Sequence, residues 1–402
     1  MFVMKPLEGL KVIELANFVA GPTCARALAN WGAEVIKVES LAGDPLRRIG
    51  INTKMPTFQE ENPNFDLANI GKKAIALNLK TVGGMAIFEK LLETSDVFIT
   101  NNRTQSLEKM GLNYEQLQEK YPQLIFAQVL GYGEKGPLKD KPGYDFTAYY
   151  ARGGLLGTLY EKGTSPLNPV PGFGDNQVAM SLVGGILAAL YKRNNTGFGD
   201  KVTVSLYHSA LFAMSTAVTS LQYGFTFPIS RKEVGNPFLN TYRTKDDRWL
   251  QLAAPEYERL FQGMMQAVGR EDLISIEKYC KFNSISENTT EIIEIIEAQI
   301  AKKTADEWMA IFEKFDIPCE KALLWDEILN DEQAWENGFL HEMHYKTGNA
   351  GTLVDLPVKF ASLGKVEHQR GPLIGENTVQ ILKNLGYSED EISKMTEARE
   401  IV

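Results

Sequence analysis

The sequence predicts an α/β fold with a mainly parallel sheet. Over the first 140 residues, short apolar runs rich in β-branched residues alternate with helical patterns. Strands separated by helices in this way are typical of βαβ units, in which successive strands run parallel. From about residue 225 to residue 330 the pattern changes to one clear strand and several short helices with acidic faces. This change predicts a second, smaller α+β domain in the middle of the chain.

The expected elements follow from the positions of apolar and turn residues. Strands are expected at residues 10–15, 34–39, 74–79, 96–100, 124–130 and 202–206. Helices are expected at residues 22–30, 84–92, 107–120, 176–193 and 208–223, and Pro22 suits the first turn of the first helix. Beyond residue 330, strand-like runs at 340–345 and 352–360 precede a terminal helix at 378–385. Breaks near residues 205 and 330 divide the chain into segments 1–205, 206–330 and 331–402.

Composition and charge exclude several classes of protein. The 402 residues are 44% hydrophobic and carry a net charge of −9, so there is no overall basic field for nucleic acid or an anionic membrane. No apolar run reaches the ~20 residues that span a bilayer, and the N-terminus is too interrupted for a signal peptide. Three scattered cysteines suit a reducing compartment, so we expect a cytoplasmic protein without disulfides.

Motifs for several common cofactors are missing from the expected positions. The first strand runs into ANFVAGPTCAR, which lacks the G-x-G-x-x-G fingerprint, so a nicotinamide cofactor is not expected. His341 and His344 are three residues apart in a segment that reads as extended, where such side chains point to opposite faces. We therefore expect no metal site there, and the lack of a G-x-S-x-G elbow argues against a serine–histidine triad.

The stretch VPGFGDNQVAM at residues 170–180 sets one carboxylate, Asp175, between a glycine-containing turn and a long apolar segment. One interpretation is a helix cap, because aspartate oxygens accept the unpaired backbone N–H groups of a first turn. The other is a nucleophile or base, because Gly172 and Gly174 leave the carboxylate open to close approach. A helix that starts near Asn176 would favour the ionised carboxylate and could offer N–H groups to an oxyanion. By itself, the stretch favours the cap.

Basic side chains are expected near one edge of the sheet. Lys72 and Lys73 precede a strand, Arg103 follows one, and Lys139 and Lys141 lie in a stretch rich in glycine and proline. In a doubly wound fold, the loops at the carboxyl ends of strands converge on the ligand crevice. Such a cluster suits a polyphosphate. The alternative is that these are ordinary solvated surface cations.

A series of segments spread over nearly the whole chain matches one known pattern. They are LEGLKVIELANFVAGPTCARALANWGAEVIKVES, GDPLR, GKKAIALNLKT, DVFITNNRTQSLEKMGL, FAQVLGYGEKGPLKDKPGYDFTAYYARGG, GFGDNQVAM and GPLIGENTVQILKNLGY. Together they resemble the family III (CaiB/BaiF-type) CoA-transferases. The resemblance implies a Rossmann-like large domain built from both chain ends, residues 1–205 and 331–402, with a linker helix and a smaller α+β domain in 206–330. It also implies a homodimer whose subunits are interlocked rings.

The resemblance further implies an activity and a mechanism. GTLYEKGT, GDKVTVSL and DEQAWEN are similar to the branch that moves CoA between an enoyl- or other acyl-CoA and a 2-hydroxy acid, such as 2-hydroxyisocaproate or phenyllactate, in amino-acid fermentation. The family's nucleophilic aspartate falls on Asp175, which forms a mixed anhydride and then an aspartyl-CoA thioester. Asp145 matches an acidic residue that orients a substrate hydroxyl or carboxyl. Acyl-CoA is a substrate, and no permanently bound cofactor, ATP or metal is implied.

The family's CoA-contacting positions carry over to loops that follow or precede the first strands. They match Val19, Ala20, Lys72, Lys73, Asn101, Arg103, Ser106, Lys109 and Lys141. Two positions depart from the pattern: Ser40 stands where some members place an arginine against adenine, and Val19 replaces a glutamine of the formyl-CoA branch. The segment GNPFLN around Asn236 lacks the glycine run of that branch, so a mobile glycine lid is not implied.

Two other functions are weighed against CoA transfer. A 2-methylacyl-CoA racemase of the same fold uses a histidine before the aspartate of a G-H-D segment, but the segment here is Gly143-Tyr144-Asp145. Tyrosine, with an ordinary pKa near ~10, is a poor base at neutral pH. A CoA-binding protein without turnover is the more distant alternative. For the acyl group, Tyr149, Tyr150, Phe173 and Phe238 are candidates to line an apolar pocket. The alternative is that they belong to the core, as aromatic residues more often do.

Overall fold

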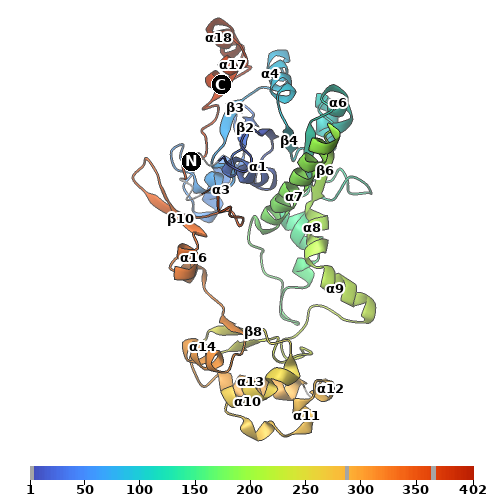
Figure 1. The fold of residues 1–402 in the computed structure, drawn as a ribbon, viewed down its shortest axis with the longest axis vertical. Coiled ribbons are helices and arrows are strands. Elements are labelled where there is room, and N and C mark those ends of the chain that lie inside the picture. The colour runs from blue at the N-terminus through green and yellow to red at the C-terminus, as the bar shows by residue number, and fades with distance from the viewer. Residues whose placement is uncertain (1–3, 286–288, 364–367) are drawn as a thin grey trace. The chain divides into compact units, whose positions relative to one another are not determined.

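The computed structural model describes residues 4–285, 289–363 and 368–402, which form two compact units (Figure 1). Unit 1 combines Met1–Leu155, Asn168–Val218 and Glu332–Val402, so it draws on both ends of the chain. Unit 2 combines Leu156–Leu167 and Thr219–Asp331. The segment 156–167, which the predicted boundaries assign to the large domain, thus belongs to the middle unit.

Unit 1 contains a six-stranded parallel sheet with the order β3-β2-β1-β4-β5-β6 (Figure 1). Its strands are β1 Lys11–Leu15, β2 Glu34–Glu39, β3 Lys73–Ala76, β4 Val97–Thr100, β5 Ile125–Leu130 and β6 Lys201–Ser205. Every pair of neighbouring strands is parallel. This is the strand order of the Rossmann fold, whose topological switch point lies between β1 and β4. The predicted parallel α/β sheet is confirmed.

The central strands are apolar because the sheet is covered on both faces. β4 reads VFIT and β5 reads IFAQVL, and every residue of both strands is buried. Strands covered on both faces need apolar side chains on both faces instead of an alternating pattern. Phe88 of α4 belongs to the same core cluster as Phe98 of β4 and Leu382 near the C-terminus. The two ends of the chain therefore share one core.

Helices surround this sheet in unit 1. They are α1 Ala20–Asn30, α2 Leu46–Ile49, α3 Pro63–Asn69, α4 Val82–Glu93, α5 Thr104–Met110, α6 Tyr114–Lys120, α7 Phe173–Thr196, α8 Leu206–Ala213, α16 Glu332–Glu336, α17 Thr378–Asn384 and α18 Glu389–Glu397. Thr81 caps α4 and Asn113 caps α6, each accepting a bond from the backbone N–H three residues on. Within the described residues, α7 alone is long and apolar enough to cross a membrane; here it packs against α1, β5 and β6.

Two expected helices are divided in the structure, and one segment has an unexpected form. The helix expected at 107–120 is split into α5 and α6 because Gly111 adopts a left-handed conformation with φ of 71°. The helix expected at 208–223 is split into α8, α9 Ser215–Ser220 and a short 3-10 turn. The π-helical segment Asp145–Ala151 has no counterpart in the prediction. Such segments are frequent at functional sites.

Unit 2 is an α+β unit with its own core. Antiparallel strands β7 Thr241–Arg243, β8 Trp249–Leu252 and β9 Cys319–Lys321 form its sheet. Its helices are α10 Tyr257–Ala267, α11 Glu277–Cys280, α12 Phe282–Ile285, α13 Thr289–Ile300, α14 Ala305–Lys314 and α15 Trp325–Ile328. Phe238 and Trp308 are buried in the core of this unit. The pattern change in the middle of the sequence thus marks a separate core.

A hairpin completes unit 1. It consists of the antiparallel strands β10 Leu340–His344 and β11 Ala350–Val354 (Figure 1). Met343 and Leu353 form a small core with Ile70, which directly follows α3. The hairpin is therefore fastened to the N-terminal half of the chain through apolar contacts.

Candidate active site

The candidate active site is a cavity of about 480 Å³ in unit 1. It is lined by the segments that follow β1, β4, β5 and β6, at the carboxyl ends of these parallel strands. Ligands of doubly wound sheets bind at this end, beside the switch point between β1 and β4. The predicted site residues that line the cavity are Val19, Ala20, Asn101, Arg103, Ser106, Lys141, Asp145 and Asp175.

Three predicted CoA contacts do not line this cavity. Lys73 forms a half-exposed ion pair with Glu34 on the neighbouring strand, with 2.6 Å between the ammonium nitrogen and the carboxylate oxygen. Lys109 lies exposed in the last turn of α5. Lys72 is buried beside β1. The basic cluster that the sequence predicts is therefore divided between the cavity, the surface and the interior.

All three donors of Lys72 are used inside the protein. Its ammonium nitrogen lies 2.6 Å from Glu14 Oε2 and donates to Pro22 O and Asn69 Oδ1, each at 2.8 Å. An ammonium group has three donors, so none is left for a nucleotide phosphate. Burial lowers the pKa of Lys72 to about 8, although the Glu14 charge opposes this effect. Lys72 thus joins β1 to the start of α1, and this position argues against the expected nucleotide contact.

Asp175 lies in the first turn of α7 and is not its cap. Gly172 occupies the cap position with φ of 81°, a left-handed conformation that glycine adopts without strain. The half-buried Asp175 carboxyl group faces the cavity three residues later. Burial, and to a lesser degree the charge of Asp145, raise its pKa to about 7. Burial thus opposes the helix field, which the sequence predicts to favour the ionised carboxylate.

Asp145 begins the π-helical segment and is tied to the start of α7 beside Asp175. Its side chain is only 7% exposed. Its Oδ1 accepts a hydrogen bond from the backbone N–H of Gly174 at 3.0 Å. Burial raises its pKa to about 6, and the backbone N–H groups of Gly172 and Gly174 oppose this rise. Its Oδ2 is buried and has no hydrogen-bond partner among the described residues, which is unusual for a carboxylate oxygen.

Gly174 is required by packing. A Cβ atom at this position would lie 2.3 Å from the ring of Tyr149 and 2.4 Å from Asp145 Oδ1. The missing side chain thus lets the π-helical segment approach α7, whereas the sequence suggested that it leaves space for substrate. The Gly174 N–H is occupied by Asp145, and the Asn176 N–H is bonded to Gly172 O at 3.0 Å. These two amides are therefore unavailable to an oxyanion in this conformation.

The loop between β1 and α1 is held in shape by the side chains of Asn101, a predicted CoA contact, and Asp44, which the sequence did not single out. Asn17 and Asn101 bond reciprocally: the Asn17 N–H donates to Asn101 Oδ1 at 3.0 Å, and Asn101 Nδ2 donates to Asn17 O at 2.6 Å. Phe18 has a positive φ of 63°, and its N–H donates to Asp44 Oδ1 at 3.1 Å. Asp44 is paired with the buried Lys37, whose ammonium nitrogen is 2.9 Å away. The loop that carries Val19 therefore has a defined conformation.

Exposed cations line one part of the cavity. Arg103, Lys139 and Lys141 contribute to it, and their side chains are exposed. In the described part of the chain, none of the three forms an ion pair with an acidic side chain. A protein with a net charge of −9 thus presents a local basic group beside the Asp175 carboxyl group.

The aromatic residues at the cavity differ from those expected. Phe18 and Tyr144 line it, with their rings edge to face and 6.1 Å between centroids. Tyr149 and Tyr150 are buried against the first turn of α7, where they contact Phe173, and Phe238 lies in the core of unit 2. The sequence alone does not indicate which aromatic residues line the cavity, because core and pocket aromatics cannot be told apart without tertiary contacts.

The sequence matches the model of one protein family, described as CoA-transferase family III, over residues 7–378. The chain belongs to CoA-transferase family III. Cinnamoyl-CoA:phenyllactate CoA-transferase of Clostridium sporogenes is 50% identical to it, over 98% of this chain and 97% of the relative. (R)-2-hydroxy-4-methylpentanoate CoA-transferase of Clostridioides difficile is 46% identical, over 98% of each chain.

Solved structures agree with this membership of CoA-transferase family III. Rv3272 of Mycobacterium tuberculosis superposes with a TM-score of 0.81 at 27% identity, over 94% of this chain and 99% of that chain. A CaiB/BaiF family protein of Brucella suis superposes with a TM-score of 0.78 at 26% identity, over 95% of this chain and 99% of that chain. The resemblance drawn from the sequence segments is therefore confirmed at the level of the family.

Proposed function

We propose that the protein moves CoA between an acyl-CoA and a 2-hydroxy carboxylic acid, with Asp175 as the nucleophile. The single observation that carries this proposal is the cavity in which the Asp175 carboxyl group and unpaired cations lie together. The substrates for which the two relatives at 50% and 46% identity are named support the 2-hydroxy acid as acceptor. CoA enters as part of a substrate, and no permanent cofactor is proposed.

The cations and the carboxyl group suit different parts of an acyl-CoA. Arg103, Lys139 and Lys141, which line the cavity, are proposed to bind the phosphates of the nucleotide, because exposed cations neutralise phosphate charge. The apolar Val19 and Ala20 line the same cavity and suit the pantetheine arm. In this arrangement the thioester carbonyl reaches Asp175. Phe18 and Tyr144 are proposed to contact the acyl group.

The proposed reaction passes CoA through the enzyme by acyl exchange. The ionised Asp175 attacks the thioester carbonyl, and CoA thiolate leaves as a mixed anhydride forms. The thiolate then attacks the Asp175 carbonyl, which releases the first carboxylate and stores CoA as an aspartyl thioester. The incoming carboxylate attacks this thioester, which expels CoA thiolate and forms a second mixed anhydride. The thiolate then attacks the carbonyl of the new acyl group, which yields the new acyl-CoA and frees the Asp175 carboxylate. Covalent catalysis thus divides one transfer into easier steps, with no ATP.

Asp145 is proposed to orient the incoming acid. Its unpartnered Oδ2 can accept a hydrogen bond from the 2-hydroxyl group of the substrate. Its Oδ1 is already fixed by Gly174, so the accepting oxygen has a defined direction. The Asp145 position therefore supports selection of a 2-hydroxy acid over an acid without the hydroxyl group.

The racemase alternative is not favoured by the residue before Asp145. Tyr144 lines the cavity where a racemase of this fold requires a histidine base, and a phenol remains protonated at neutral pH. A carrier without turnover would bind acyl-CoA yet leave Asp175 unmodified. Covalent labelling therefore separates transfer from both alternatives.

The deciding experiment traps the intermediates. Protein incubated with acyl-CoA and quenched with hydroxylamine is expected to carry a hydroxamate on Asp175 alone, as detected by peptide mass. The Asp175→Asn variant should lose labelling and lose turnover by at least about 10⁴-fold, as expected for removal of a nucleophile. Asp66→Asn, a buried aspartate outside the cavity, is the matched control and should retain both. An unlabelled Asp175 in active wild-type protein would contradict the mechanism.

We further propose the assembly and domain layout that the family resemblance implies. Residues 1–205 and 331–402 form the large domain, except for Leu156–Leu167, which group with the middle unit, and 206–330 hold the linker helix and small domain. Two subunits interlock as rings in a homodimer. Unit 1 draws on both chain ends, as this layout requires.

A further inference from the structure

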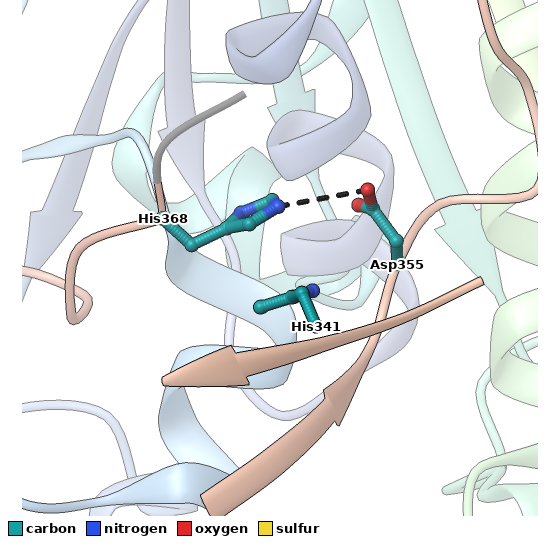
Figure 2. A group of neighbouring side chains, drawn as sticks. All are labelled: His341, Asp355 and His368. Carbon is teal, nitrogen blue, oxygen red and sulfur yellow. Dashed lines mark ion pairs between the residues drawn. The ribbon is translucent and has the colours of Figure 1, made fainter. Parts of the chain in front are cut away.

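A cluster of two histidines and one aspartate lies outside the candidate active site (Figure 2). His341 lies on β10, Asp355 directly follows β11, and His368 lies in the segment that leads to α17. One ligand atom from each residue lies within 4.8 Å of the other two. His368 Nε2 is 3.5 Å from Asp355 Oδ2, and the two imidazole rings stack with 3.6 Å between centroids. It is the one group of this kind in the described ranges.

The hairpin register explains why the side chains meet. The Asp355 N–H donates to Phe339 O at 2.9 Å, so the antiparallel pairing continues one residue beyond β11. Phe339 and His341 are two residues apart and therefore share a face of the strand. Asp355, opposite Phe339, lies on that same face. His344, three residues from His341, is 73% exposed and takes no part, as the extended segment predicts.

The buried imidazoles have nitrogens without partners. The His368 side chain is only 5% exposed, and its Nδ1 is buried with no hydrogen-bond partner among the described residues. Both ring nitrogens of His341 are buried and unpartnered in the same sense. A neutral imidazole carries one N–H donor and one lone pair, and buried groups of this kind are nearly always satisfied. A metal ion can accept a lone pair from each of the two rings and so satisfy both.

The Asp355 carboxylate is held by its other oxygen. Its Oδ1 accepts a bond from the Leu356 N–H at 2.8 Å and lies 3.6 Å from the Arg26 guanidinium. Arg26 is itself buried and donates to Leu67 O at 2.7 Å. Oδ2 is therefore left facing the imidazoles. Partners that orient a ligand through its second atom are typical of metal sites.

The spacing fits a tetrahedral ion, but one of the two stacked imidazoles must turn out of the stack before both lone pairs point to one ion. Bonds of about 2.0–2.2 Å place neighbouring ligand atoms about 3.3 Å apart, close to the 3.5 Å between His368 and Asp355. The cluster also faces a cavity of about 460 Å³, lined in part by Trp31, Trp335 and His341. Three protein ligands therefore leave a fourth position open to water or another ligand.

We propose that His341, Asp355 and His368 bind one divalent transition-metal ion, of which Zn²⁺ is the representative. Imidazole and carboxylate ligands suit this class of ion. The ion would fasten the β10–β11 hairpin to the segment before α17, because it joins residues from both. The proposal is independent of the function assigned to Asp175.

Calorimetric titration of tag-free, metal-depleted protein with ZnCl₂ tests this site. One Zn²⁺ per chain is expected. His341→Gln and His368→Gln should each weaken binding by more than about 100-fold, which exceeds the effect of removing a residue that only supports a metal ligand. His344→Gln, on the same hairpin, is the matched control and should bind as the wild type does. Failure of the wild type to bind one equivalent would overturn the proposal, as would an equal loss in the control.

The visible absorption spectrum of the wild-type protein with bound Co²⁺ identifies the type of ligand, even if a variant fails to fold. Visible bands of a tetrahedral ion without a thiolate charge-transfer band are expected. A thiolate band would show that Cys280 or Cys319, which are only partly buried, binds the ion, and it would overturn the assignment.

Discussion

At the scale of single residues, the two carboxyl groups of the cavity control each other. Asp175 is proposed to act only when ionised, and its pKa is raised to about 7 by burial and by the Asp145 charge. Asp145, with a pKa near 6, is mainly charged at neutral pH. The rate should therefore rise with pH through the ionisation of Asp175.

The Asp145→Asn variant tests this coupling. Loss of the neighbouring negative charge lowers the pKa of Asp175, so the acidic limb of kcat/KM against pH should move to lower pH. The amide oxygen can still accept the Gly174 N–H, which preserves the loop. If Asp145 also orients the hydroxyl group, KM for the 2-hydroxy acid should rise while KM for acyl-CoA changes little. An acidic limb that stays at the wild-type pH would contradict the coupling. The control variant Asp66→Asn, outside the cavity, should leave the acidic limb where it is in the wild type.

At the scale of elements, the segments after β1 and β4 position the site through buried polar contacts. Glu14 of β1 pairs with Lys37 through Oε1 and with Lys72 through Oε2, at 2.8 and 2.6 Å. Lys37 in turn pairs with Asp44, which holds the Phe18 N–H. Each charge in this network depends on its partner, because an unpaired charge in the interior is strongly unfavourable.

Adjacent lysines provide a matched test of this network. Lys72→Met should lower the free energy of unfolding by about 3–5 kcal/mol, because it leaves Glu14 short of a partner in the interior. Lys73→Met breaks only the half-exposed ion pair with Glu34 and should change the free energy of unfolding by at most about 1 kcal/mol. Urea unfolding of each variant measures these free energies. Equal stability of the two variants, with KM for acyl-CoA raised by Lys72→Met, would restore Lys72 as a nucleotide contact.

The basic residues after β4 and β5 make a second test. Arg103→Ala and Lys141→Ala should each raise KM for acyl-CoA by about 3- to 10-fold, as expected for exposed charge pairs, with little change in KM for the free acid. Lys109→Ala, on the helix that begins beside Arg103 but outside the cavity, should have a smaller effect. Steady-state kinetics with each substrate varied gives these values. An equal rise for both substrates would mean that the CoA site is misplaced.

At the scale of the whole molecule, the proposed interlocked homodimer predicts slow subunit exchange. A native mass of about twice 44.9 kDa is expected by light scattering. Tagged and untagged dimers mixed without denaturant should form no mixed species over hours, because rings threaded through each other separate only after unfolding. Mixed dimers should appear after joint refolding. Rapid exchange under native conditions would argue for an ordinary, unthreaded interface.

Local patterns in the sequence determined the parallel sheet and the two kinds of unit. Apolar runs such as IFAQVL can be recognised as covered strands because strand composition depends on burial of both faces. Gly111 shows the limit of this reasoning, since its left-handed turn divides a helix that the apolar pattern reads as continuous. The segments quoted above likewise established the family, because their order over the chain is far more specific than any one motif.

Asp175 shows how the two sources combine. The stretch alone favoured a cap, and the resemblance over the whole chain implied a nucleophile instead. The structure then placed Gly172, not Asp175, at the cap position. Tertiary contacts also decided that Lys141 reaches the cavity while Lys72 is buried, and that His341 meets His368 instead of His344. The physical reason is common to all three: burial and the pairing of distant charges depend on where the chain returns in space, which no local pattern records.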